Sequence, residues 1–507
     1  MPDKVIATNE GALRQKYNAA GLRAVKAAVA RLIAADKTRG LVTRYVAIDN
    51  AITMKKLGGL PVTSVQNCRQ NKEAIDSVWK SLKPDYLMIL GATDVVPHQD
   101  MRNPVNAAGD DPDVVAFSDL PYACDTPYSR DVAKFIGPTR VVSRLPDMTG
   151  ADEPGHLLAV LATAAAWKQW PASDQSRYFG LSAREWRGST ELSLTNVFGS
   201  NPSLNLSPPS GPAFPSKVMS APSHFINCHG GDVDPNFYGQ KGNAYPVALS
   251  SPGIAKMIAH GTIAAVECCY GAQLYAPGAL RLPIPICQNY LAQGAYAYFG
   301  STTIAYGPAD GNGAADLIAQ YFLLKVLEGS SVGMATLAAR QEFVAQTGQM
   351  DPVDLKTLAQ FCVYGDPSIH PVLIATPTGV PKGTHAGVVE SLDRRERRAK
   401  LALTGRSLQE QKPTAAVPQR RHAISPQVRA VLSGLSREAG VPSASFVAFA
   451  VKAKGGARSG KAVTDANRYH VLVARTRQRW GHVVQRVAIV AKEAAKRVVG
   501  YRVYFTR

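Results

Sequence analysis

Two segments of the sequence end in residues that could perform nucleophilic chemistry. One apolar run is followed at once by His229 and two glycines, and a later apolar run ends in the adjacent pair Cys268 and Cys269. A cysteine thiolate attacks carbonyl carbons, an imidazole takes and returns the proton, and glycine turns let a substrate carbonyl approach backbone N–H groups. These residue types fit a Cys–His dyad.

The two runs are expected to be neighbouring strands. HFINC (224–228) and TIAAVEC (262–268) are apolar, β-branched or aromatic, and helical segments separate them from the next run. In open α/β sheets, ligands bind outside the carboxyl ends of the strands. His229 and the cysteine pair would then be delivered to the same place.

Two other interpretations of these residues stay open at this point. A single histidine is commonly a hydrogen-bonded structural residue, and adjacent buried cysteines commonly behave as small apolar side chains. Alternatively, His224, Cys228 and His229 offer soft zinc ligands together with the cysteine pair, although they lack a recognised zinc spacing.

The elements that must position these residues alternate between strands and helices along the first 375 residues. Asn71 is expected to cap one of the helices, and residues 92–130 are expected to form surface loops. The predicted strands are KVIAT (4–8), LVTRYVAI (41–48), PDYLMILG (84–91), HFINC (224–228), TIAAVEC (262–268) and AYFGSTTIAYG (297–307). The predicted helices cover residues 11–35, 71–82, 153–170, 254–259, 286–292, 316–328 and 333–346.

The fold class is therefore α/β, with a mostly parallel sheet or sheets flanked by helices, plus a small basic α+β domain at the C-terminal end. The pattern does not decide between one continuous sheet and two adjoining subdomains. Four parts are expected: an N-terminal α/β subdomain (1–170), a catalytic subdomain (171–375), a basic linker containing Pro and Gly (376–423) and a C-terminal domain (424–507).

The C-terminal domain is predicted in more detail. Ser425-Pro426 is typical of a helix start, and the helix should run to about Glu438. Four β-rich segments follow, of which residues 491–496 are compatible with either a strand or a helix. The linker has room for one exposed helix.

The net charge is confined to the C-terminal part. Residues 381–507 contain 26 Lys and Arg against 7 Asp and Glu, which accounts for the whole net charge of +19. Arginines alternate there with aromatic residues, and this composition suits phosphate contact and base stacking. A nucleic acid and an acidic protein are both candidate partners through residues 381–507, whereas no segment has the long apolar helical face with basic flanks that membrane-surface binding requires.

The overall composition indicates a folded protein of the cytoplasm. With 46% hydrophobic and 19% charged residues, the 507-residue chain can bury sizeable cores. No stretch reaches the roughly 18 apolar residues of a membrane span, and the N-terminus lacks the apolar core of a signal peptide. The seven cysteines show no disulfide-scaffold spacing, so free thiols in a reducing compartment are expected.

An ordered set of segments also resembles a known family. HFINCHGG and AAVECCYGA resemble the His-Gly and Cys blocks of the caspase-like clan of cysteine peptidases, clan CD. PDYLMILGATDVVP, SDLPYACD, VVSRLPD, GAYAYFGSTTIAYGP and FCVYGDPSIHP resemble its gingipain-type branch, in the same order, over about residues 1–375. The resemblance implies a caspase-like α/β fold of two adjoining subdomains and peptide-bond hydrolysis through a thioester acyl-enzyme, with no metal or cofactor.

The resemblance also implies roles for individual residues. His229 matches the catalytic histidine of the clan, and Gly230 matches the glycine after it. The C-x-x-G spacing of most branches selects Cys268 as the nucleophile, whereas the C-x-G spacing of caspases selects Cys269. We expect Cys268 to be the nucleophile, with the N–H groups of Gly230 and Cys268 as the oxyanion site and Cys269 as the alternative.

Acidic residues near these blocks suggest the substrate preference. Glu185 and Glu191 fall where the gingipain branch keeps acidic residues, and Asp232 and Asp234 compete with them as pocket acids. A carboxylate at the base of the pocket would select Arg or Lys in the substrate.

The expected function is a cytoplasmic cysteine endopeptidase that cuts after Arg or Lys and is regulated. It differs from the secreted gingipains because it lacks a signal peptide and has a basic C-terminal part where they carry an immunoglobulin-like module. Self-processing in the linker is a further hypothesis, with residues 394–400 and Arg420-Arg421 as candidate sites. The alternative is a non-catalytic caspase-like scaffold whose basic tail binds nucleic acid or an acidic protein partner.

Overall fold

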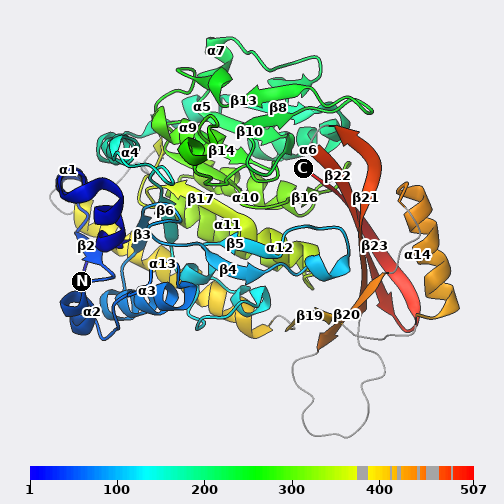
Figure 1. Cartoon of the computed structure of the whole chain (residues 1–507), viewed down its shortest axis with the longest axis horizontal. Coiled ribbons are helices and arrows are strands. Elements are labelled where there is room, and N and C mark those ends of the chain that lie inside the picture. Colours follow the sequence, from blue (N-terminus) through cyan, green and yellow to red (C-terminus); the bar gives the residue numbers. More distant parts are fainter. Residues whose placement is uncertain (374–385, 412–413, 419–423, 442–445, 453–467, 481–482) are drawn as a thin grey trace, which may run out of the picture.

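A ten-stranded sheet forms the centre of the molecule (Figure 1). The computed structural model describes residues 1–373, 386–411, 414–418, 424–441, 446–452, 468–480 and 483–507. In spatial order the strands are β2 (Thr43–Ala47), β1 (Lys4–Thr8), β3 (Tyr86–Leu90), β6 (Val142–Leu145), β17 (Phe361–Gly365), β15 (Ala297–Ser301), β14 (Ile263–Val266), β10 (Ser223–Asn227), β8 (Tyr178–Ala183) and β9 (Leu204–Ser207).

The sheet consists of two parallel halves that run in opposite directions. β17 and β15 pair antiparallel at the centre, and every other neighbouring pair is parallel. The question that the sequence left open is thereby answered: two α/β halves share one continuous sheet. β17 completes the first half although it follows the second half in the sequence, so the halves are not separated at a single point of the chain.

Helices cover both faces of this sheet, and the alternation of strand residues shows which face is which. Ala264 and Val266 belong to one apolar core, and Ile263 and Ala265 belong to the other, because successive side chains of a strand point to opposite faces. The first core contains α1 (Glu10–Thr38), α4 (Gly155–Ala166) and α9 (Ile286–Ala292). The second contains α6 (Arg187–Phe198), α10 (Ala315–Leu327), α11 (Val332–Thr347) and α12 (Pro352–Gln360).

Shorter elements connect these layers. The remaining helices of the body are α2 (Ala51–Lys56), α3 (Cys68–Leu82), α5 (Ala172–Gln175), α7 (Ser216–Met219) and α8 (Pro277–Leu280). The remaining strands of the body are β4 (Gln99–Arg102), β5 (Val115–Ser118), β7 (Trp170–Pro171), β11 (His229–Gly230), β12 (Asn236–Tyr238), β13 (Val247–Ser250), β16 (Tyr306–Gly307) and β18 (Val372–Leu373).

Five of the six strands predicted for the body are present as single strands, and the sixth, residues 297–307, is divided into β15 and β16 in different sheets. Most predicted helices are present too, with three corrections. The side chain of Asn67, not Asn71, caps α3, because Asn71 lies inside the helix and is buried. Residues 254–259 do not form a helix, because the 3₁₀ turn Pro252–Ile254 ends at the first of them. Residues 92–130 include the antiparallel pair β4 and β5, and many of their side chains are buried.

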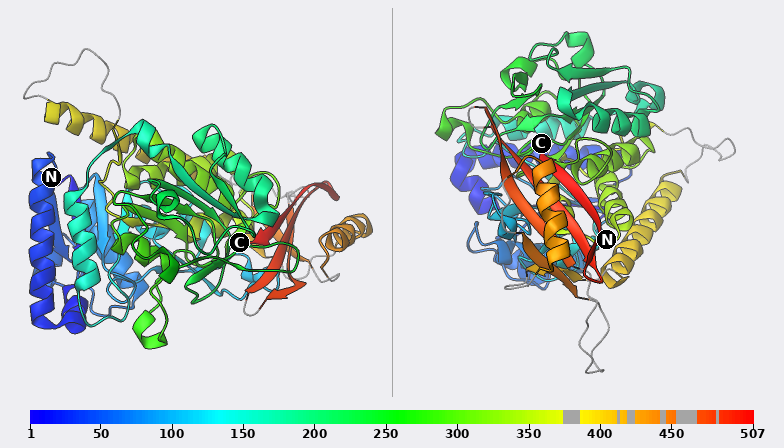
Figure 2. Two further views of the ribbon diagram at one scale, coloured as in Figure 1. Left: turned by 90° about the horizontal axis from the view of Figure 1, so that it is seen from above. Right: turned by 90° about the vertical axis from the view of Figure 1, so that its right-hand side faces the viewer.

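The C-terminal part forms a six-stranded antiparallel sheet that is joined to the body (Figures 1 and 2). Its order is β16, β23 (Arg497–Thr506), β22 (Val483–Ala494), β21 (Arg468–Trp480), β20 (Val447–Lys452) and β19 (Thr414–Pro418). The predicted helix α14 (Pro426–Glu438) packs its apolar side on this sheet, and residues 491–494 are strand. Because β16 belongs to the body, the last strand of the chain, β23, is hydrogen-bonded directly to the body.

The linker contains one long helix, α13 (Ala386–Gln411), which lies along α11. Residues 374–385, 412–413 and 419–423 of the predicted linker lie outside the described residues. In the part of the chain that the structure describes, no helix is both long enough and apolar enough to cross a membrane.

Candidate active site

The two strand ends that carry the predicted dyad lie side by side. β10 and β14 pair in parallel, with Ile226 opposite Val266. The turns beyond them are in close contact, since a Cβ atom on Gly230 would lie 1.8 Å from the carbonyl oxygen of Cys269. Only glycine at position 230 lets β11, which carries His229, approach the cysteine turn in this way.

The two cysteines belong to different cores. Cys268 is fully buried in the core that contains α9, whereas Cys269 is 3% exposed and belongs to the core that contains α10. Glu267, the residue before the pair, is also fully buried and interacts with Asp316 in the first turn of α10. Glu267 and Cys269 are thus associated with the α10 side of the sheet, and Cys268 with the opposite side.

His229 is enclosed by aromatic rings and held by an amide. Its ring centroid lies 4.2 Å from that of Trp186 and 5.0 Å from that of Tyr245, and its Nε2 lies 2.7 Å from Oε1 of Gln240. Nε2 of Gln240 donates to the carbonyl of Gly242 at 3.2 Å, which fixes the orientation of the amide. Nε2 of His229 therefore carries the ring proton, and Nδ1 is the basic nitrogen.

Burial keeps this imidazole and both thiols uncharged at neutral pH. Desolvation lowers the pKa of His229 to about 3, against the effect of its hydrogen bond to Gln240. Desolvation also raises the pKa of Cys269 to about 12 and the pKa of Cys268 well above its usual value. Sγ of Cys269 accepts a hydrogen bond from the backbone N–H of Ala305 at 3.2 Å and is 3.4 Å from the carbonyl oxygen of the same residue.

The backbone of Arg507 reaches into this site. Its carbonyl oxygen accepts hydrogen bonds from the N–H groups of Gly230, at 3.2 Å, and of Cys269, at 3.0 Å. Its own N–H donates to the carbonyl of Ala305 at 3.0 Å. Two N–H groups from two different turns thus converge on one carbonyl oxygen, which is the arrangement that stabilises an oxyanion in acyl transfer.

The side chain of Arg507 fills a buried acidic pocket. Its Nη2 lies 2.9 and 3.1 Å from the two carboxylate oxygens of Asp316 and donates to the carbonyl of Pro308 at 2.6 Å. The guanidinium carbon lies 4.5 Å from the ring centroid of Trp186. Gly307 forms a wall of the pocket, since a Cβ atom at that position would lie 2.3 Å from Nη2.

The charges in the pocket balance. Burial and the neighbouring Asp316 both raise the pKa of Glu267 well above its usual value, which favours the neutral form of its carboxyl. One carboxylate, on Asp316, is then paired with one guanidinium, on Arg507, and both side chains are fully buried. Because an unpaired buried charge is costly, this pocket requires a cation.

The acidic residues proposed from the sequence lie outside this pocket. Glu185 is exposed and accepts the N–H of Gly242 at 2.7 Å. Glu191 pairs with Arg187 on the same helix at 2.7 Å. Asp232 is exposed and accepts from Gln273 at 2.6 Å, and Asp234 accepts from Asn236 and Tyr238. Each of these carboxylates is thus engaged with a local partner.

The residues considered as zinc ligands are also engaged in other contacts. Both ring nitrogens of His224 are hydrogen-bonded, Nδ1 to the hydroxyl of Tyr290 at 2.8 Å and Nε2 to the carbonyl of Met219 at 3.1 Å. Within the described residues, the one group of three ligand-type side chains whose atoms lie within 4.8 Å of one another is elsewhere, at His98, Asp119 and Cys362. All seven cysteines are free.

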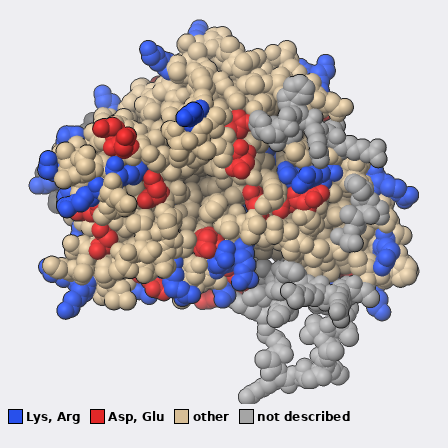
Figure 3. Space-filling model, viewed as in Figure 1, with Lys and Arg blue, Asp and Glu red and all other residues tan. Residues whose placement is uncertain are grey.

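Much of the basic charge of the C-terminal part is used within the chain. Arg394 of α13 binds Asp3 and Asp85 at 2.9 Å each, so this helix is docked on the body through one side, while Arg395, Arg397 and Lys400 are exposed. Arg502 of β23 pairs with Asp354 at 3.3 Å. Among the side chains coloured in Figure 3, Lys and Arg are spread around the outline with Asp and Glu between them. The described residues on that face form no single basic patch.

One of the two candidate self-cleavage sites in the linker lies within the described residues and is helical. Residues 394–400 lie inside α13, so this segment is not an extended chain of the type that β-strand addition would bind. Arg420-Arg421 lies outside the described residues.

Comparisons with known proteins give low similarity. No family model matches the chain, and no curated protein matches it. A solved structure described as "Structure of Protease" aligns with a TM-score of 0.49 at 12% identity, over 99% of this chain and 96% of that chain. The Saccharomyces cerevisiae separase–securin complex aligns with a TM-score of 0.29 at 14% identity, over 46% of this chain and 14% of that chain.

Proposed function

We propose that the protein is a caspase-like cysteine endopeptidase with His229 as the proton carrier and Cys269 as the nucleophile. The observation that carries the proposal is Arg507, which contacts the site as the residue before a scissile bond would. The carbonyl of this residue meets two N–H groups, its N–H is bound, and its cation is paired in a closed pocket. A recognition site for an arginyl peptide next to a thiol and an imidazole supports peptide hydrolysis.

The choice of Cys269 over Cys268 rests on the oxyanion N–H groups. The expected oxyanion pair was Gly230 with Cys268, but the N–H groups that reach the Arg507 carbonyl belong to Gly230 and Cys269. The thiol of Cys269 contacts Ala305, whose carbonyl also binds the N–H of Arg507. The thiol of Cys268 is buried in the core on the other side of the sheet. We therefore propose Cys269 in place of Cys268.

The proposed reaction proceeds in two balanced steps. Nδ1 of His229 takes the thiol proton, and Sγ of Cys269 forms a bond to the carbonyl carbon while the oxyanion is held by the two N–H groups. The imidazolium then gives its proton to the leaving amine as the C–N bond breaks, which leaves a thioester. In the second step water attacks the thioester, His229 takes the proton of the water, and the proton returns to the thiolate of Cys269 as it leaves.

The pocket supports a preference for arginine before the cut bond. A guanidinium is planar, stacks on Trp186 and donates to Asp316 and Pro308 at the same time. A lysine ammonium in the same pocket has no plane to stack on the indole. We expect kcat/KM for Arg peptides to exceed that for Lys peptides by at least about tenfold, and that for Asp or Leu peptides by about 10³-fold or more.

The residues before the arginine would add a strand to the body. Thr506 and Phe505 pair antiparallel with Tyr306 and Gly307 of β16. Main-chain pairing of this kind binds extended peptides with little demand on their side chains. The substrate class is therefore an extended segment of a protein with arginine at its carboxyl side.

The proposal is tested by hydrolysis of fluorogenic peptides ending in Arg, Lys, Asp or Leu. The assay uses the wild-type chain and the Arg507→Ala chain, because Arg507 occupies the pocket. In the Arg507→Ala background, Cys269→Ala is expected to lower kcat/KM for the Arg peptide by about 10³-fold or more, and Cys268→Ala, the matched control, by no more than a few-fold. Full activity in Cys269→Ala contradicts the proposed nucleophile, and absence of hydrolysis in every variant favours the non-catalytic scaffold.

A further inference from the structure

We propose that the last strand, β23, together with Arg507 is a built-in inhibitor that keeps the active site closed until this segment leaves it. This inference rests on the proposed function, because an inhibitor needs an enzyme to inhibit. The basic charge of residues 381–507 does not indicate this role, and the resemblance to the gingipain branch ends near residue 375.

The segment occupies each part of the site that a substrate would need. Arg507 takes both oxyanion N–H groups, the carbonyl of Ala305 and the acidic pocket. Thr506 and Phe505 take the free edge of β16, which pairs with no other strand of the described residues. Cys269 is 3% exposed and His229 is 1% exposed under this cover. A second peptide therefore cannot bind while β23 stays in place.

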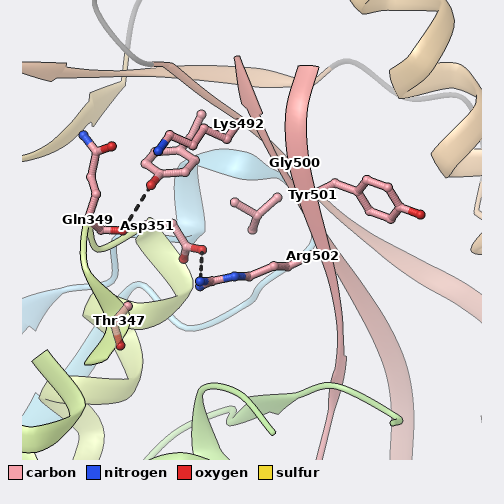
Figure 4. A pocket seen from close by; sticks show the side chains of 9 residues that line it. Thr347, Gln349, Asp351, Lys492, Gly500, Tyr501 and Arg502 are labelled. Carbon is pink, nitrogen blue, oxygen red and sulfur yellow. Dashed lines mark hydrogen bonds and ion pairs between the residues drawn. The ribbon is translucent and has the colours of Figure 1, made fainter. Parts of the chain in front are cut away.

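The segment is anchored at a second point away from the site. Figure 4 shows Arg502 of β23 extended toward Asp351, which caps α12, while Tyr469 of β21 donates to the carbonyl of Gln349 at 3.0 Å. Arg502 lies 3.7 Å from the carboxylate of Asp351 and 3.3 Å from that of Asp354. These contacts hold the C-terminal sheet on the body at the end of α11, so the inhibitory end is tethered near its binding site.

Tethering makes the inhibition effective without tight binding. A segment joined to its site by a short connection acts at an effective concentration of about millimolar. A free peptide substrate at micromolar concentration then competes poorly with it. An inhibitor of this type need not bind strongly, because it is never diluted.

The geometry also provides a way to open the site without unfolding the domain. β23 pairs with β16 over only two residues, Tyr306 and Gly307, whereas its pairing with β22 extends from Arg497 to Phe505. Detachment of the final residues therefore breaks the short pairing and the Arg507 contacts while β23 remains in its own sheet. Local opening of this kind costs less than global unfolding.

The experiment compares the full-length wild-type chain with Arg507→Ala and with the charge-matched control Arg497→Ala, whose side chain is exposed at the start of the same strand. A chain that ends at Thr506 is the second test variant, and thermal melting monitors folding. Arg507→Ala and the shortened chain are expected to hydrolyse a fluorogenic peptide ending in Thr-Arg at least about tenfold faster than wild type in kcat/KM. Arg497→Ala is expected to equal wild type.

A second arm adds the inhibitor back in trans. The synthetic peptide Val-Tyr-Phe-Thr-Arg, which has the sequence of residues 503–507, is expected to inhibit the Arg507→Ala chain competitively, and the same peptide ending in Ala is expected not to inhibit. Equal hydrolysis by wild type, Arg507→Ala and Arg497→Ala overturns the inhibitor and leaves the protease in place. If no chain hydrolyses the peptide, including Arg507→Ala and the shortened chain, both the proposed function and the inhibitor are overturned.

Discussion

The two halves of the central sheet share one architecture but treat buried charge differently. In the first half, Arg144 of β6 is paired with Asp119 at 2.6 Å, within the same half of the fold. Two further buried acids of this half, Asp3 and Asp85, are paired with Arg394 of α13. In the second half, the buried acids Glu267 and Asp316 meet their cation only from the far end of the chain, in Arg507. The pair of Arg144 and Asp119 lies wholly within the first half, whereas in the proposed function a substrate arginine would replace Arg507 beside Asp316.

Burial affects the carboxyl groups of Asp119 and Glu267 differently because their partners differ. Burial alone would raise the pKa of Asp119, but Arg144 and His98 lower it below its usual value, so the carboxylate is stabilised within the fold. Burial and Asp316 raise the pKa of Glu267, and Arg507 only partly offsets this. A site whose charge is balanced by a detachable residue is prepared to bind a cationic side chain.

Breaking the pair of Arg144 and Asp119 is expected to have the largest effect, and the effect is on stability. Asp119→Asn leaves the guanidinium of Arg144 buried without a charged partner, which costs about 3–5 kcal/mol of unfolding free energy. Urea unfolding of the variant measures this loss. Asp119→Asn molecules that remain folded are expected to keep the kcat/KM of the chain without this change. A loss of activity without a loss of stability would contradict a purely structural role of Asp119.

Breaking the pair that Asp316 forms is expected to affect recognition instead. In the Arg507→Ala chain, Asp316→Asn removes the carboxylate that the guanidinium contacts, so kcat/KM for Arg peptides should fall by about 100-fold, or about 2.7 kcal/mol. The midpoint of urea unfolding should change little relative to the Arg507→Ala parent, because the pocket no longer contains a paired guanidinium. Unchanged hydrolysis of Arg peptides would remove Asp316 from the specificity pocket.

A smaller effect is expected from filling the pocket wall. Gly307→Ala places a methyl group where the guanidinium of an arginyl substrate would lie, since the added Cβ is 2.3 Å from Nη2 and 2.4 Å from Nε of Arg507. In the Arg507→Ala background we expect kcat/KM for Arg peptides to fall by about tenfold, mainly through a higher KM. Gly311→Ala serves as the control, because a Cβ there has open space, although its positive φ of 82° adds local strain. Equal kinetics in the Gly307→Ala chain and its parent would show that the pocket is wider than described.

Acid sensitivity is the property that the two halves should share. Burial lowers the pKa of His98 in the first half and of His224 in the second to about 4, from an unfolded value near 6.5. The unfolded chain therefore binds these protons first as pH falls. The stability associated with each neutral histidine is complete above pH 6.5 and is lost from there down to about pH 4, by about 1.4 kcal/mol per pH unit.

Thermal melting between pH 7 and pH 5 measures this loss. The wild-type Tm should fall with pH, and His98→Gln and His224→Gln should each flatten the dependence to a similar extent. A Tm that is independent of pH in this range would show that the two histidines are not neutral and buried as described.

The strand positions and the proximity of His229 to the cysteine pair were accessible from the sequence because they depend on local pattern. The apolar runs at 224–228 and 262–268 identified adjacent strands, and the rule for the carboxyl ends of parallel strands brought His229 and the cysteine pair together. The junction between β17 and β15 was not accessible, since it joins strands from different parts of the chain.

The choice between the two cysteines had a partial signal in the sequence. Side chains two residues apart on a strand point to the same face of the sheet. Continued past the strand, this alternation places Glu267 and Cys269 on the same face as Ile263 and Ala265. The C-x-x-G spacing favours Cys268 instead. The strand ends at Val266, so the directions of the side chains of Cys268 and Cys269 depend on the turn that follows.

The pocket could not be predicted, because its parts are distant in sequence. Asp316 comes from a helix start, Trp186 precedes α6, and Arg507 belongs to the C-terminal sheet. Glu185 and Glu191 were close to the right region, since Trp186 lies between them. Their side chains are satisfied by Gly242 and Arg187, and nothing local in the sequence reveals those contacts.

Site-directed labelling tests the central claim most directly. A peptidyl-arginyl chloromethyl ketone would be added to the wild-type, Arg507→Ala and Arg497→Ala chains, and mass spectrometry would identify the alkylated cysteine. The account predicts rapid modification of Cys269 in the Arg507→Ala chain and modification at least about tenfold slower in the other two. Modification of Cys268, or equal labelling rates in all three chains, would contradict it.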